Sequence, residues 1–132
     1  MSDDLLTQIA AEKFVSLTTF RRDGSAIATP MWIIRDGTAL VAWTPADSGK
    51  VTRLHRDPRV ELSPCGRTGK VAADAPVLRG TAEVLTEAAT VSHAAALIKD
   101  KYGLEFRIVT VAEAVLARGR KPRVALRIST AA

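Results

Sequence analysis

The chain has 132 residues and 47% of them are apolar, which excludes a disordered chain and predicts one globular domain, residues 1–132. A net charge of +5 favours an anionic partner, but only 5% of residues are aromatic and none interleave with the basic clusters, so we expect a small anionic ligand rather than nucleic acid. The acidic start, the lack of a membrane-spanning run and the single Cys65 predict a cytoplasmic location.

The first third of the chain is predicted to form a helix and an antiparallel meander. The helix covers residues 3–13, and the three strands cover 14–20, 25–35 and 38–43. Asp23-Gly24 and Asp36-Gly37 are signals for tight turns between these strands. Pro30 lacks the N–H that a central strand needs, so we expect the second strand at an edge or with a bulge.

The remaining two thirds are predicted to add three strands and three helices. The helices cover 47–57, 87–102 and 110–118, and the strands cover 59–63, 77–85 and 122–130. Residues 64–76 hold several Pro and Gly and are expected to form a loop, while Gly80 marks a bulge or a close backbone approach. Thr110 and Glu113 fit a capping box that begins the last helix. These elements predict a mainly β fold, a six-stranded antiparallel β-barrel with peripheral helices.

The most informative local pattern lies where the strand 38–43 passes into the next helix. We expect Asp47 to cap this helix, with Ser48, Gly49 and Lys50 in its first turn. Arg53 follows one turn later on the same side. A helix start offers unpaired backbone N–H groups and a positive dipole end, which hold phosphate well when a hydroxyl and a Lys lie beside them. This is not a nucleotide P-loop, because Val follows the Lys and the upstream Gly is missing.

Large flat and flexible side chains occur near the same strand ends. Met31, Trp32 and Trp43 either fill the barrel interior or form the wall of a site for a flat ring. Because Pro30 disturbs the strand there, we expect the backbone at residues 29–32 to face a ring.

Signatures of metal binding and acid–base catalysis are missing from the sequence. His55 and His93 have no Cys or His partner at metal-ligand spacing, and Cys65 has no His nearby. No Ser-His-Asp or paired-carboxylate arrangement stands out. We therefore predict no metal site and assign no catalytic residue.

Five short segments together indicate a family. They are Phe14 to Phe20 with Arg22-Asp23-Gly24, Ala28 to Trp32, Trp43-Thr44 followed by Ser48-Gly49-Lys50, Arg56 to Val60, and Leu78 to Ala82. In this order they resemble the pyridoxamine-phosphate-oxidase-like split β-barrel superfamily, which includes FMN-binding proteins, and in particular its branch that uses the deazaflavin coenzyme F-420. The resemblance implies a homodimer with a cofactor site at each subunit interface.

The resemblance also implies which residues bind the cofactor. Trp43, Thr44 and Lys50 match positions that hold the phosphate in FMN-binding relatives, whereas Gly49 and Pro30 replace basic residues of those relatives and favour F-420 over FMN. With the residues of the helix start, the expected cofactor-binding set is Thr29, Pro30, Met31, Trp32, Trp43, Thr44, Ser48, Gly49, Lys50 and Arg53. The C-terminal Trp and Arg motif of pyridoxamine phosphate oxidases is missing, which argues against vitamin B6 oxidation.

The resemblance implies an oxidoreductase that transfers a hydride between F-420 and a conjugated small organic substrate. An FMN-dependent oxidoreductase of the same fold, a carrier that binds the cofactor without turnover, and a nucleic-acid-binding protein are the alternatives. We expect residues 64–76 and 103–110 to build the pocket for the substrate, because loops form such pockets in small barrels.

Overall fold

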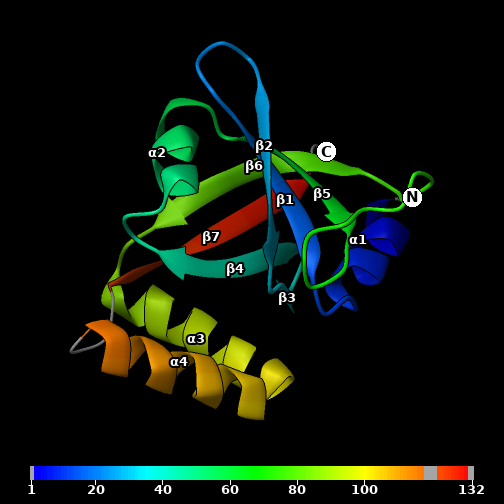
Figure 1. Cartoon of the computed structure of the whole chain (residues 1–132). Helices are drawn as coiled ribbons and strands as arrows, with labels where there is room; N and C mark the ends of the chain where they lie inside the picture. Colours follow the sequence, from blue (N-terminus) through cyan, green and yellow to red (C-terminus); the bar gives the residue numbers. More distant parts are fainter. Residues whose placement is uncertain (1, 118–121, 131–132) are drawn as a thin grey trace.

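The computed structural model describes residues 2–117 and 122–130, which form one curled antiparallel sheet of seven strands, a half-barrel, with helices packed around it (Figure 1). The elements are α1 (Ser2–Ala10), β1 (Val15–Phe20), β2 (Ala26–Met31), β3 (Ile34–Asp36), β4 (Ala39–Pro45), α2 (Gly49–Arg56), β5 (Arg59–Pro64), β6 (Leu78–Leu85), α3 (Ala88–Tyr102), α4 (Leu104–Ala117) and β7 (Arg123–Thr130). The mainly β fold class with peripheral helices is thus confirmed. None of the described helices is both long enough and apolar enough to cross a bilayer.

The strand order is β2-β1-β5-β6-β7-β4-β3, which corrects two predictions. The expected strand 25–35 is divided at Trp32 and Ile33 into β2 and β3, so the sheet has seven strands instead of six. The expected meander is wrong as well, because the β1–β2 and β3–β4 hairpins lie at opposite edges of the sheet. Pro30 does lie in an edge strand, as predicted, since β2 pairs only with β1.

The division at residues 32 and 33 has a packing cause. Ile33 is fully buried in the apolar cluster inside the half-barrel. The preceding residue, Trp32, points to the outside of the half-barrel, where its ring stacks on Tyr102 with ring centroids 4.4 Å apart. Only these two residues separate β2 from β3, although the two strands lie at opposite edges. The edges must therefore approach each other, which curls the sheet.

Two apolar clusters lie on the two faces of β4. Leu40 and Ala42 point into the half-barrel, while Val41 and Trp43 point outward. This alternation follows from the period of two along a strand. Helices α1 and α2 add Leu6, Ile9, Val51 and Leu54 to the inner cluster. Helix α3 covers the outer face, mainly with buried Ile98, so β4 is buried on both sides.

Helix α4 follows α3 after a single residue, and the two helices lie side by side below β4 (Figure 1). The turn between them uses Gly103 at φ 56°, a backbone conformation that favours glycine. The predicted start at Thr110 is wrong, because this residue lies inside the helix and its hydroxyl donates to the Phe106 carbonyl at 2.9 Å. The predicted helix end, Arg118, lies outside the described residues.

Tyr102 joins three parts of the fold through its hydroxyl. The Tyr102 hydroxyl oxygen accepts a hydrogen bond from the Ile33 N–H at 2.9 Å, and the hydroxyl O–H donates one to the Lys13 carbonyl at 2.8 Å. We expect Tyr102→Phe to lower the free energy of unfolding by about 1–3 kcal/mol, because a buried N–H loses its acceptor. Urea denaturation measures this change, and Ser92→Ala, which removes an exposed hydroxyl from the same helix, is the control.

The same hydroxyl gives the stability a pH dependence. Burial raises the pKa of Tyr102 from 10 to about 12. The neutral phenol therefore stabilises the fold fully below pH 10, and this contribution is lost as pH rises from 10 to 12, where only the unfolded chain ionises. Between these pH values wild type should lose about 2–3 kcal/mol more than Tyr102→Phe. The free energy of unfolding is measured against pH for both proteins. If it falls by the same amount in wild type and in Tyr102→Phe between pH 10 and 12, the prediction is wrong, because the folded protein would then not protect the phenol from ionisation.

Candidate functional site

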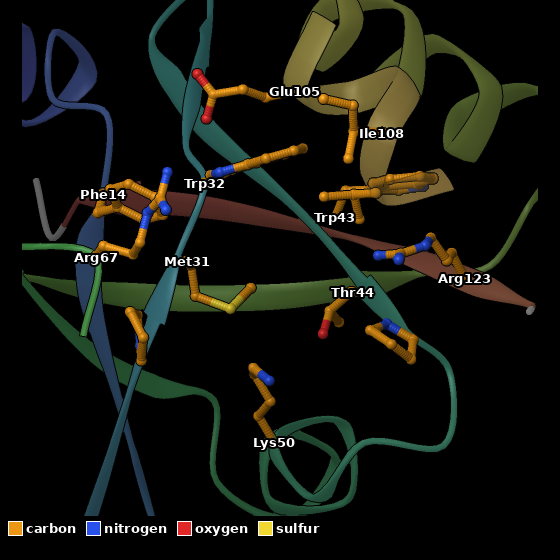
Figure 2. A pocket seen from close by; sticks show the side chains of 13 residues that line it. Phe14, Met31, Trp32, Trp43, Thr44, Lys50, Arg67, Glu105, Ile108 and Arg123 are labelled. Carbon is orange, nitrogen blue, oxygen red and sulfur yellow. The ribbon is translucent and has the colours of Figure 1, made fainter. Parts of the chain in front are cut away.

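A pocket of about 680 Å³ lies where the ends of β2 and β4, the start of α2 and one side of α4 meet (Figure 2). This volume is in the range of small-molecule and cofactor sites. Six of the ten predicted site residues line it, namely Pro30, Met31, Trp32, Trp43, Thr44 and Lys50. The curl of the sheet brings them together, since β2 and β4 lie far apart in the strand order.

The other four predicted site residues do not line the pocket. Ser48 and Gly49 lie at the start of α2, beside the pocket-lining Lys50, and Arg53 lies one turn further along the helix. Thr29 is one residue before the stretch of β2 that lines the pocket. We call Ser48, Gly49, Lys50 and Arg53 the α2 corner. It forms one end of the pocket, because Lys50 extends into the cavity on the same side as Thr44 (Figure 2).

The start of α2 has more hydrogen-bond donors than acceptors. Ser48, not the predicted Asp47, is the N-cap, with an extended backbone, and its side chain makes no capping hydrogen bond. The Ser48 hydroxyl oxygen is buried and has no partner in the described structure. The first turn of α2 carries no acidic side chain. An anion at this end would supply the acceptors that the helix start lacks.

Glycine at position 49 allows a guanidinium to approach the helix start. A Cβ built on Gly49 would lie only 2.9 Å from an Nη of Arg53. The Arg53 side chain is fixed by its Nε–H, which donates to the buried Thr19 hydroxyl at 2.7 Å. The α2 corner therefore fits an anionic group such as a phosphate.

The charges at this corner repel one another. Burial lowers the pKa of Lys50, and the Arg53 guanidinium lowers it further. Burial also lowers the pKa of Arg53, with added repulsion from Arg21 and Arg56. Arg56 is held by a neutral acceptor, the Phe20 carbonyl at 2.7 Å, and no described carboxylate pairs with Lys50 or Arg53. A bound anion would relieve this repulsion and raise both pKa values.

The tryptophans at the pocket serve the core and the cavity together. Trp32 stacks on Tyr102, and Trp43 stacks on Phe106 with centroids 5.3 Å apart, while both rings also line the pocket. The guanidinium of Arg123 lies 3.8 Å above the Trp43 ring. Core packing thus fixes the orientation of two flat apolar walls.

Seven pocket residues are not in the predicted cofactor-binding set. They are Phe14, Pro45, Arg67, Glu105, Ile108, Val109 and Arg123. The segments 64–76 and 103–110, which were expected to build the pocket, do contribute Arg67 and three residues of α4, although the second segment is helical and not a loop. No local motif marks these side chains, because only packing brings them to the cavity. Within the described residues, no group of His, Cys, Asp and Glu could hold a metal ion.

Comparisons with known proteins agree with this architecture. The sequence model of the family described as pyridoxamine 5'-phosphate oxidase matches residues 1–132. The chain belongs to the pyridoxamine 5'-phosphate oxidase family. Members of this family include oxidoreductases and bind flavin-type cofactors. No functionally curated protein matches the chain.

Solved structures share the pyridoxamine 5'-phosphate oxidase fold at low identity. The conserved hypothetical protein Rv2991 from Mycobacterium tuberculosis is 21% identical with a TM-score of 0.72, over 100% of this chain and 81% of that one. A putative 5-nitroimidazole antibiotic resistance protein from Bacteroides thetaiotaomicron is 13% identical with a TM-score of 0.69, over 100% and 81%. A protein named F420 reductase is 19% identical with a TM-score of 0.61, over 95% and 92%. These similarities show the fold.

Proposed function

We propose that this protein is an oxidoreductase that binds the deazaflavin coenzyme F-420 and transfers a hydride between it and a conjugated small organic substrate. The observation that carries the proposal is a pocket with flat apolar walls whose one end is the electropositive α2 corner. A flat heterocycle with a phosphate fits this combination. The similar fold of a protein named F420 reductase supports it.

Each part of the site has a role in this proposal. The α2 N–H groups, the Ser48 hydroxyl and Lys50 hold the phosphate, next to Thr44. Met31, Trp32 and Trp43 pack against the ring. F-420 is a longer polyanion than FMN because its phosphate is followed by a poly-glutamate tail. Arg53 and Arg56, which continue along α2 from Lys50, suit this tail.

The chain's own residues bind and orient rather than exchange protons. Bound reduced F-420 would supply the hydride, and the proton needed for the two-electron reduction of the acceptor would come from water. Trp43 is held by Phe106 and Arg123, so the wall that would lie against the ring is rigid. A rigid wall would hold the ring in one orientation toward the acceptor. This mechanism needs no acid–base pair, and we assign no catalytic residue.

We further propose that the protein is a homodimer with the cofactor at the subunit interface. Large apolar side chains on α4 are exposed beside the pocket, with Leu104 71% and Ile108 60% exposed. A second subunit packed over α4 would cover these side chains and close the pocket. Analytical ultracentrifugation with and without cofactor measures the association.

Titration with F-420 and with FMN tests the cofactor assignment. We expect micromolar or tighter binding of F-420 and weaker binding of FMN, because only F-420 extends beyond the phosphate to Arg53 and Arg56. The preference should shrink as salt is added, since exposed charges are screened. Isothermal titration calorimetry at two salt concentrations measures the affinities for F-420 and FMN and the effect of salt on their ratio. Tight binding of FMN alone would contradict the assignment and favour the FMN-dependent alternative.

A second measurement separates the enzyme from a carrier. Reduced F-420 is mixed with the protein and a quinone such as menadione, or with a tetrapyrrole, and the recovery of absorbance by the oxidised cofactor is followed. We expect oxidation that depends on the protein. Tight cofactor binding without oxidation by any acceptor would favour a carrier, whereas a salt-dependent shift of DNA or RNA would favour nucleic-acid binding.

A further inference from the structure

Arg67 is a pocket residue that the proposed cofactor contacts do not use. It lies in the segment between β5 and β6, and its side chain reaches the pocket on the side opposite Arg123 (Figure 2). The backbone around it is fixed, because the Gly66 N–H donates to the Lys70 carbonyl at 3.1 Å and the Gly69 N–H donates to the Gly66 carbonyl at 2.9 Å. Arg67 therefore projects from a short closed loop.

This loop is also packed against the pocket wall. Gly69 has a φ of 93°, and a Cβ at this position would lie 3.4 Å from Cδ of Pro30, a pocket residue of β2. The backbone of the loop thus approaches β2 closely. That contact keeps Arg67 at the cavity.

Arg67 has no counter-charge in the described structure. The one acidic side chain among the described pocket residues is Glu105, and its carboxylate is paired with Nζ of Lys13 at 2.6 Å. No described carboxylate lies within ion-pair distance of Arg67. The same pocket is lined by Phe14 and Trp32, which are aromatic. The pocket therefore combines flat apolar surfaces with a guanidinium that no described carboxylate neutralises.

We propose that Arg67 binds a carboxylate of the acceptor and that the acceptor is therefore a planar, conjugated carboxylic acid in its anionic form. This inference rests on the proposed function, because only an oxidoreductase has an acceptor that could be the ligand at Arg67. Guanidinium suits this role because its fork of N–H donors matches a carboxylate bidentately. The phosphate at the α2 corner and the carboxylate at Arg67 then occupy different ends of the pocket.

The test compares an acid with its neutral, nearly isosteric amide. The probes are 2-naphthoate and 2-naphthamide, and the readout is intrinsic fluorescence, because the chain has 2 tryptophans and both line the pocket. We expect the acid to bind roughly 10-fold more tightly, as for a charge-assisted hydrogen bond near solvent. Arg67→Gln should abolish this preference with naphthamide binding unchanged, and Arg67→Lys should keep part of it.

Two further variants make the assignment specific. Arg79→Gln removes an exposed guanidinium of β6 that pairs with Glu61 away from the pocket, so the preference should be unchanged. Lys50→Ala should leave the preference intact as well. If the preference survives Arg67→Gln and disappears in Lys50→Ala, the acid binds at the α2 corner and the inference is wrong.

The experiment is repeated by calorimetry with protein saturated with F-420. We expect both ligands to bind together, with the Arg67-dependent preference retained. Mutual exclusion of 2-naphthoate and F-420 would overturn the inference, because Arg67 would then belong to the cofactor subsite. If F-420 does not bind at all while the free protein still shows the Arg67-dependent preference, the proposed cofactor is wrong and the carboxylate site at Arg67 is supported.

Discussion

Replacing Lys50 with alanine is expected to weaken F-420 binding about 10- to 100-fold. A hydrogen bond to a charged group contributes about 1.5–3 kcal/mol, and 1.4 kcal/mol corresponds to about tenfold in affinity. The ammonium group of Lys50 has no described carboxylate partner, and burial beside Arg53 lowers its pKa, so it depends on an anion for stabilisation. Calorimetric titration of F-420 into the wild type and the variant measures the difference.

The chain supplies a matched control in its second Gly-Lys pair. Lys70 also follows a glycine but is exposed in the loop before β6 and does not line the pocket. Lys70→Ala removes the same charge from the protein, so a general electrostatic effect would weaken binding equally in both variants. Equal affinities for Lys50→Ala and wild type would place the phosphate elsewhere. Thermal denaturation of all three proteins checks that folding is intact.

Gly80→Ala is expected to destabilise the protein far more than Gly66→Ala. Gly80 lies in β6, between Val60 of β5 and Thr130 of β7. A Cβ at this position would lie 2.3 Å from the carbonyl oxygen of Ser129, which is backbone and cannot rotate away. Relief requires separation of two paired strands, so we expect a loss of about 3 kcal/mol or more.

Differential scanning calorimetry measures this effect, and Gly66→Ala is the matched control. Gly66 has open space where a Cβ would lie, and its backbone does not adopt a positive φ. The control should change stability by less than about 0.5 kcal/mol, whereas Gly80→Ala should lower Tm by roughly 10 °C. Similar Tm values for the two variants would mean that β7 can shift without cost. The sequence predicts either a bulge or a close backbone approach at Gly80, and the structure shows the close approach.

The candidate site depends on the curl of the sheet. The end formed by the α2 corner is local, since residues 44 to 53 belong to one strand end and the following helix. Its opposite wall comes from β2 and from the loop that carries Arg67. These parts meet because β2 and β3 occupy the two edges of the sheet and are joined by two residues. A flat sheet with the same strands would have no such cavity.

The sequence by itself determined what neighbouring residues control. Period-two alternation, Asp-Gly turns and the apolar face of residues 87–102 predict most strands and the helix α3, and the Ser-Gly-Lys sequence predicts the α2 corner. Such signals are local, because side-chain period, turn geometry and helix ends depend on a few adjacent residues. Even for this local feature the prediction is one residue off, because the N-cap of α2 is Ser48 and not Asp47.

Only the tertiary structure decided how β2 ends, where α4 begins and which side chains complete the pocket. Trp32 and Ile33 are adjacent, yet they are drawn into two clusters on opposite sides of the sheet, and this divides a segment that is apolar enough to read as one strand. Residues 104–110 become helical with Phe106 packed on Trp43, a contact across more than sixty residues. Arg67 reaches the cavity through loop packing against Pro30. Long-range packing fixes all three, and adjacent residues carry no signal of it.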